Sequence, residues 1–145
     1  MKWLMFLVAA WSALILTSVI KSNLPANYWF KPIILVVADA EVGTCPEIEY
    51  QRMIRRPFSG TWLATLQRQN QAGTFTRYRI WRGESDYRPE NGLPDALFRN
   101  LGWWFETDDC NWPAGVYRVL TTWTIHPDVG GPRVTRITSN VFTIH

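Results

Sequence analysis

Residues 60–82, GTWLATLQRQNQAGTFTRYRIWR, carry the clearest structural pattern in the chain. Apolar and polar side chains alternate on both sides of the turn-forming segment 70–73, NQAG, and this is the pattern of a β-hairpin. The apolar residues that share one face are Trp62, Ala64 and Leu66 on the first arm and Tyr78 and Ile80 on the second. We therefore expect these residues to face the core, and Arg77, Arg79 and Trp81 to face outward.

Strand patterns continue on both sides of this hairpin. The segments with β-branched runs or alternating apolar residues are Ile33–Ala38, Ile48–Ile54, Val116–Ile125 and Val134–Ile144. In the second segment Ile48, Tyr50 and, less cleanly, Arg52 alternate with three other residues, Glu49, Gln51 and Met53, which is a weak strand pattern. The last segment changes phase near Ser139–Asn140, because Ile137 and Phe142 share a face only if a β-bulge lies between them.

The region between the hairpin and residue 116 is less regular. Residues 84–95 are rich in turn formers and predict a long connection, while Asp95–Asn100 is expected to cap and start a short helix that stops at Gly102. A brief strand is expected at Trp103–Glu106. Together these patterns predict a mainly β domain, an antiparallel β-sandwich of about seven short strands with one short helix.

The N-terminus predicts a membrane span. Trp3–Ile20 is an uncharged run of eighteen residues between Lys2 and Lys21. As a helix it is about 27 Å long, close to the roughly 30 Å of hydrocarbon in a bilayer. We expect an anchor at 1–21, a linker at 22–31 and the β domain at 32–145. A cleaved signal peptide and a soluble core helix stay open as alternatives, and the lysines at the two ends do not decide the orientation.

The end of the chain resembles a known architecture. Residues 113–119, PAGVYRV, followed by 139–144, SNVFTI, resemble the last two strands of many bacterial immunoglobulin-like domains. In those domains a G-x-Y entry places a tyrosine, here Tyr117, at the corner of the penultimate strand. The resemblance implies an immunoglobulin-like sandwich. Cys110 precedes this strand, whereas the antibody pattern has its cysteine two residues after the tyrosine, so the usual inter-sheet disulfide does not carry over.

Cys45 and Cys110 are the only cysteines, and each lies beside turn residues. In an oxidising compartment they would close a loop of about 65 residues, which the chain-entropy description values at roughly 4 kcal/mol. We predict a disulfide and hence an extracytoplasmic domain. Two free buried thiols in a cytoplasmic domain are the alternative.

Composition argues against several functions. The residues after Ser22 include 13 Lys and Arg and 12 Asp and Glu, so the folded part lacks the basic excess that nucleic-acid binding needs. His126 and His145 have no nucleophile motif beside them, and the acidic residues do not follow a calcium-loop spacing. We expect no enzyme activity, no cofactor, no metal and no small-molecule substrate.

The leading hypothesis is a single-pass membrane protein with its C-terminal domain in the periplasm or at the cell surface. It would be a non-enzymatic protein-interaction module, an accessory subunit of an envelope assembly. The partner-binding candidates are Arg77, Arg79, Trp81, Trp104 and Trp112. One alternative is a carbohydrate-binding domain that uses exposed Trp81, Trp104 or Trp112. Another is a secreted domain released by signal cleavage.

Overall fold

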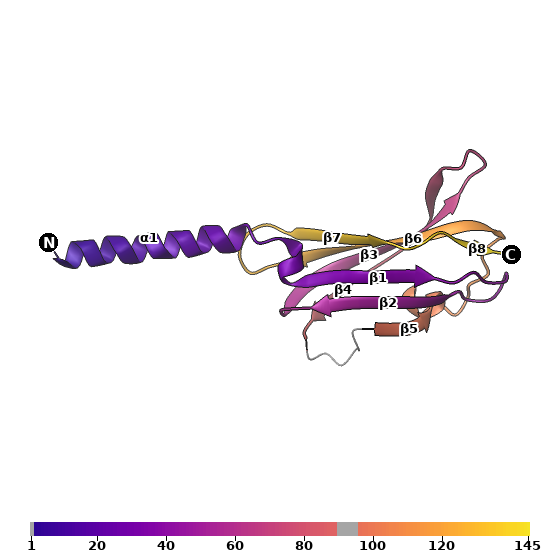
Figure 1. The fold of residues 1–145 in the computed structure, drawn as a ribbon, viewed down its shortest axis with the longest axis horizontal. Helices are drawn as coiled ribbons and strands as arrows, with labels where there is room; N and C mark the ends of the chain where they lie inside the picture. The colour runs from indigo at the N-terminus through magenta and orange to yellow at the C-terminus, as the bar shows by residue number, and fades with distance from the viewer. Residues whose placement is uncertain (1, 90–95) are drawn as a thin grey trace.

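The apolar N-terminal segment forms one long helix, α1 (Lys2–Ser22), which extends away from the rest of the chain (Figure 1). The structure, a computed structural model, describes residues 2–89 and 96–145. All eighteen residues of the window Met5–Ser22 are described, and none of them is buried. By length and composition α1 is a candidate membrane span, and the same properties fit a signal sequence.

A short connection joins α1 to the β domain. It contains one turn of 3₁₀ helix, η1 (Ala26–Tyr28), and leads into strand β1, which begins at Phe30. The side chain of Phe30 is fully buried in the domain core, so the predicted linker is shorter than 22–31. A residue that is distant in the sequence also holds the connection, because Arg133 donates hydrogen bonds to the carbonyl oxygens of Ser22 and Leu24.

The β domain consists of two antiparallel sheets. The first has the order β1-β2-β5 and is made of β1 (Phe30–Val37), β2 (Glu47–Ile54) and β5 (Ala96–Asn100). The second has the order β4-β3-β6-β7 and is made of β3 (Phe58–Gln69), β4 (Phe75–Tyr87), β6 (Gly115–His126) and β7 (Arg133–Thr138). Strand β8 (Phe142–Ile144) also pairs with β6. The prediction of a mainly β domain with antiparallel strands is confirmed.

Aromatic side chains from both sheets form one shared core. The ring of Phe30 on β1 lies 5.0 Å from that of Trp123 on β6 and 5.7 Å from that of Phe58 on β3. Tyr50 on β2 stacks on Trp123 at 6.1 Å. The inner faces of the two sheets therefore pack against each other (Figure 1).

The predicted phase change in the last strand is confirmed. Strands β7 and β8 both pair with β6, but their registers differ by one residue, since Leu120 is opposite Thr138 and Tyr117 is opposite Phe142. Ser139 lies at the break, where its hydroxyl oxygen accepts a hydrogen bond of 2.9 Å from the backbone N–H of Val119. The side chain thus replaces a ladder contact that the bulge removes.

Three local predictions between residues 84 and 106 are wrong. Strand β4 continues to Tyr87, so residues 84–87 are extended and not a turn. The predicted helix at 96–100 is strand β5, because this segment pairs with the edge of β2; Asp95, its predicted cap, lies outside the described residues. A single helical turn, α2 (Leu101–Trp104), replaces the strand expected at Trp103–Glu106.

The true cap of α2 is Asn100. Its backbone is extended (φ −112°, ψ 165°), and its side-chain oxygen accepts a hydrogen bond of 2.9 Å from the N–H of Trp103. Tertiary pairing therefore decides the conformation of 96–100, and the capping residue moves to the end of the strand.

Candidate functional site

The predicted disulfide between Cys45 and Cys110 is present, with the two Cα atoms 5.0 Å apart. It joins the loop after β1 to the loop before β6, at the end of the domain opposite α1 (Figure 1). Helix α2 packs directly on it. A Cβ atom on Gly102 would lie 2.9 Å from the Sγ of Cys45 and 2.6 Å from the carbonyl oxygen of Thr107, so only glycine fits there.

The face assignment of β4 is wrong, because a bulge interrupts the hairpin. Leu66 is opposite Arg79 and Gln67 is opposite Arg77, which leaves Tyr78 as an extra residue on β4. Beyond this bulge the side chains that the sequence predicted to face outward, such as that of Trp81, therefore face the core. The predicted partner surface required Arg77, Arg79 and Trp81 to share an outward face, and they do not.

The side chains of β4 show this inversion. Trp81 is opposite Ala64 on the inner face and stacks on Phe105, with the ring centroids 3.9 Å apart. Ile80, predicted to be in the core, is 39% exposed. Trp81 therefore contributes to the core and does not form the predicted binding surface with Arg77.

The other two tryptophan candidates differ from each other. Trp112 is 1% exposed and packs edge to face with Phe105. Its ring does not reach the surface, so it cannot bind a partner there as predicted. Trp104 on α2 is half-buried and lines a cleft between the two sheets. Of the predicted candidates, Trp104 is the one that the structure brings into a concave site.

The cleft lies between the inner faces of the two sheets, beside α2. Its walls are β2 in the first sheet and β3, β4 and β6 in the second. The cavity has a volume of about 1150 Å³. Its aromatic lining consists of Tyr50, Trp62, Tyr87, Trp103, Trp104 and Trp123, and its polar lining includes Arg52, Ser85, Glu106 and Thr121.

Trp62 packs against Gly83, its cross-strand neighbour on β4. A Cβ atom on Gly83 would lie 2.7, 2.9 and 3.0 Å from the Cζ2, Cε2 and Nε1 atoms of the indole. The indole therefore occupies the space that a side chain at position 83 would need. Trp62 is half-buried and lines the cleft.

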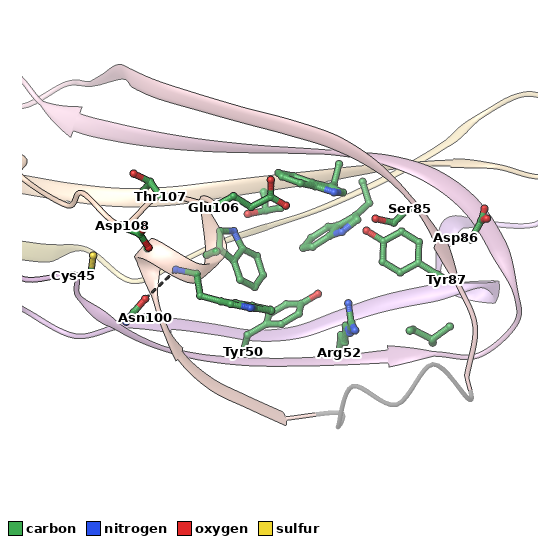
Figure 2. Close-up of a pocket in the computed structure, with 17 residues that line it drawn as sticks. Cys45, Tyr50, Arg52, Ser85, Asp86, Tyr87, Asn100, Glu106, Thr107 and Asp108 are labelled. Atoms are coloured by element: carbon green, nitrogen blue, oxygen red, sulfur yellow. Dashed lines mark hydrogen bonds between the residues drawn. The ribbon is translucent and has the colours of Figure 1, made fainter.

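Arg52 lies between two tyrosine rings of the cleft. The carbon of its guanidinium group is 5.9 Å from the ring centroid of Tyr50 and 5.9 Å from that of Tyr87, within the range of a cation–π contact. Figure 2 shows the hydroxyl groups of both tyrosines and the guanidinium group directed toward the same space. Tyr50 is further held by an edge-to-face contact of 4.6 Å with Trp104.

Two residues of the cleft wall carry buried hydroxyl groups and are each 1% exposed. The phenol of Tyr50 faces the guanidinium group of Arg52, whereas the alcohol of Thr121 has no hydrogen-bond partner among the described residues. Burial raises the pKa of Tyr50, and burial likewise raises the pKa of Tyr87. Both phenols therefore stay protonated at neutral pH and act as hydrogen-bond donors. A buried hydroxyl without a partner costs about 1–3 kcal/mol of stability, and the alcohol of Thr121 is such a group.

Part of this site had a signal in the sequence. The alternation of β2 places Arg52 on the inner face after Ile48 and Tyr50, and a charged residue at a core position indicates a polar pocket. Thr121 interrupts the apolar inner face of β6 between Val119 and Trp123 in the same way. The role of Trp62 gave no such signal, because it depends on the absence of a side chain at position 83 on another strand.

No protein-family model matches the chain, and comparisons with curated proteins and with solved structures find no significant match. Within residues 2–89 and 96–145, no group of three His, Cys, Asp or Glu side chains is placed to hold a metal ion. Function is therefore inferred from α1, the disulfide and the cleft.

Proposed function

We propose that this protein is a membrane-anchored, extracytoplasmic binding module. Helix α1 crosses the bilayer once and carries an immunoglobulin-like β-sandwich on the outer side, where the domain serves as a non-enzymatic accessory subunit of an envelope assembly. The observation that carries this proposal is an unpacked apolar helix in the same chain as a disulfide-bonded domain.

The exposed surface of α1 supports the anchor. Its large apolar side chains find no partner in the described part of the domain; Trp3 is 84% exposed and Trp11 is 67% exposed. An apolar surface of this size is unfavourable in water and favourable in lipid. The polar side chains of the helix also suit a bilayer, because Ser12 and Thr17 donate hydrogen bonds of 2.8 and 2.9 Å to the carbonyl oxygens of Val8 and Ala13.

The Cys45–Cys110 pair supports the outer side of the membrane. Disulfides form and persist in oxidising compartments and are rare in the cytosol. The positive-inside rule does not oppose this placement, since Lys2 and the amino terminus balance Lys21 and Lys31 across α1.

The order of the strands supports the immunoglobulin-like assignment. Strand β4 belongs to the sheet of β3, β6 and β7 and forms its edge beside β3. The fourth strand has this place in sandwiches of the variable type. The chain after β1 also crosses to the second sheet, where Ala40 forms a parallel bridge with Ile144.

A tyrosine corner supports the same assignment. The hydroxyl of Tyr117, near the start of β6, donates a hydrogen bond of 2.6 Å to the carbonyl oxygen of Pro113, four residues upstream. This is the hydrogen bond that defines a tyrosine corner in immunoglobulin-like domains.

The cleft supports a role in binding. Its lining combines aromatic faces with phenol and alcohol hydroxyl groups and one guanidinium, which are groups that hold and orient a ligand. It also replaces the predicted surface of Arg77, Arg79 and Trp81 as the place where a partner binds.

Membrane extraction tests the proposal. The full-length chain is expressed in a bacterium, its membranes are washed with alkaline carbonate, and the intact mass is measured after alkylation without reductant. We expect the protein in the carbonate-resistant pellet, with Met1 retained and no alkylated cysteine. The matched control is Leu14→Arg, which places a charge in the middle of α1 at a cost of about 2.5–3.5 kcal/mol for insertion and should release the protein. Full-length protein in the soluble fraction, or two alkylated thiols, would contradict the proposal.

A further inference from the structure

We propose that the end of the β domain next to α1 binds the headgroups of anionic phospholipids in the adjacent leaflet of the membrane. The contact is made by five cations, here called the basic collar: Lys21, Lys31, Arg55, Arg56 and Arg133. This inference rests on the proposed function, because it needs α1 to span a bilayer. It adds a second attachment to the membrane, one that fixes the orientation of the domain.

Three segments that are distant in the sequence gather at the C-terminal end of α1 (Figure 1). They are the connection 23–29, the β2–β3 turn 55–57 and the β6–β7 loop 127–132. The turn is fastened to the connection, because the backbone N–H groups of Arg55 and Arg56 donate hydrogen bonds of 2.7 and 3.4 Å to the carbonyl oxygen of Trp29. The loop touches the helix itself, since a Cβ atom on Gly130 would lie 3.1 Å from the Cα of Ser22. All three segments are therefore held beside the end of α1.

The position of Ser22 sets the level of the collar in the bilayer. The apolar run Trp3–Ile20 fills about 27 Å of the roughly 30 Å of hydrocarbon, so Ser22 lies among the headgroups. Arg133 donates hydrogen bonds to the carbonyl oxygens of Ser22 and Leu24, so its guanidinium group lies at the same level. Because the connection is bonded to the domain in this way, it holds the domain against the headgroups.

The charges of the collar arginines are not cancelled by the bonds that they form. Arg56 lies over the ring of Tyr28, with its guanidinium carbon 4.3 Å from the ring centroid. Arg55 donates a hydrogen bond of 3.4 Å to the sulfur atom of Met53, and Arg133 bonds to carbonyl oxygens. These partners are all uncharged. The contacts orient the guanidinium groups and leave their positive charge available to an anion.

Carboxylates at this end of the domain are fewer than the cations. Among the described residues they are Asp128, in the β6–β7 loop, and Asp86, which is opposite Ser59 near the start of β3. Lys21 and Lys31 are both exposed. The end of the domain next to α1 therefore has an excess of positive charge, although the folded part of the chain as a whole is nearly neutral.

Aromatic side chains suit the same level. Tyr28 and Trp29 are half-buried and pack edge to face, with their ring centroids 4.9 Å apart. Tyr and Trp concentrate at the headgroup level of membranes, because their rings are apolar and carry one polar group. Val129 in the β6–β7 loop is 42% exposed and adds an apolar contact at this end.

The bilayer is the partner that this surface faces. Because α1 leaves the domain among the collar residues, an acidic protein would have to enter between the domain and the membrane. Each Lys or Arg close to an anionic bilayer strengthens attachment about fivefold. The contact keeps the Cys45–Cys110 end of the domain directed away from the membrane (Figure 1).

The collar forms only when the chain folds. Lys21 and Lys31 are close to α1 in the sequence, whereas the three arginines follow the first strand and reach the membrane through the fold. Positive charges orient a span mainly within about 15–20 residues of its ends. The arginines therefore do not oppose an outer location of the domain.

The test compares full-length protein in nanodiscs of neutral phosphatidylcholine with the same protein in nanodiscs that contain about one-third anionic phosphatidylglycerol. Hydrogen–deuterium exchange is measured by mass spectrometry in the three segments at the end of α1. The turn 70–74, at the far end of the domain, is the internal reference. The collar variant is Arg55→Gln/Arg56→Gln. The matched control is Arg77→Gln/Arg79→Gln, which also removes two exposed arginines, one of them 5.9 Å from a tyrosine ring.

We expect exchange in the three segments to be about fivefold or more slower in the anionic nanodiscs, with no change in the reference turn. High salt should abolish the difference, because it screens exposed charges. The collar variant should lose most of the difference and the control variant should keep it. If the collar variant does not fold, Lys21→Gln/Lys31→Gln replaces it with the same expected result.

Three results would overturn the inference. One is equal exchange in neutral and anionic nanodiscs, and another is a full difference that the collar variant retains. The third is the same slowing when inorganic phosphate is added to neutral nanodiscs, which would indicate a site for a small anion. Each of these leaves the membrane-anchored module in place, whereas failure of the proposed function is recognised separately, by soluble protein or free thiols.

Discussion

Breaking the Cys45–Cys110 disulfide should lower the free energy of unfolding of the β domain by about 4 kcal/mol. The two cysteines are separated by 65 residues in the sequence. Closing a loop of that length removes roughly 14 cal/mol/K of entropy from the unfolded chain, which corresponds to this free energy at 25 °C. The loss is a large part of the roughly 5–15 kcal/mol by which a small domain is stable.

The assay is urea denaturation of the full-length protein in detergent micelles, followed by tryptophan fluorescence with and without reductant. The double variant Cys45→Ala/Cys110→Ala should match the reduced protein and should not respond to reductant. Reduction should also increase amide exchange in α2, which packs on the disulfide, more than in the 70–74 turn. A decrease in unfolding free energy below about 1 kcal/mol would refute the assumption that the disulfide constrains the unfolded chain.

Three further predictions follow from single residues. Tyr117→Phe removes the hydrogen bond of the tyrosine corner and should cost about 1 kcal/mol in urea denaturation; an unchanged midpoint would show that the bond contributes nothing. Gly102→Ala should cost about 1–3 kcal/mol in the same assay, because the new methyl group overlaps the disulfide and a carbonyl oxygen, and wild-type stability would refute that contact. The domain should lose stability as the pH rises above about 10, measured by denaturation at pH 9, 10 and 11. Burial raises the pKa of Tyr50 and of Tyr87, so both phenols stay protonated in the folded state. In the unfolded chain the same phenols have a pKa near 10.0 and lose their protons, which favours unfolding. Tyr50→Phe should weaken this pH dependence, and an equal slope in the variant would contradict the assignment.

The sequence predicted those parts of the fold that depend on local periodicity. The arms of the hairpin, the strands at 48–54 and 116–125, and the break near Ser139 appear where alternation places them. The disulfide was predictable because the chain contains two cysteines in turn-rich segments. The N-terminal helix was predictable because no charge interrupts its apolar run.

The errors arise where contacts between distant segments decide the structure. The bulge at Tyr78 reverses the faces of β4, and a one-residue insertion leaves no mark in the composition of the strand. Residues 96–100 form a strand because β2 offers them an edge, although Asn100 has the chemistry of a helix cap. Local propensity is overridden in both places by sheet pairing.

The cleft was accessible to sequence reasoning only in part. Arg52 and Thr121 mark it as polar residues on inner faces of strands. Its walls come from strands of both sheets and from α2, and the placement of Trp62 depends on Gly83 across the ladder. Neither relation is visible until strand order and register are known.

The side of the membrane on which the β domain lies tests the central claim most directly. Spheroplasts of a bacterium that produces the full-length protein are treated with protease, and the protected fragment is identified by mass spectrometry beside a cytoplasmic marker protein. The account predicts that the β domain is digested while the marker stays intact and α1 survives in the membrane. A β domain that resists protease until the spheroplasts are lysed would contradict it.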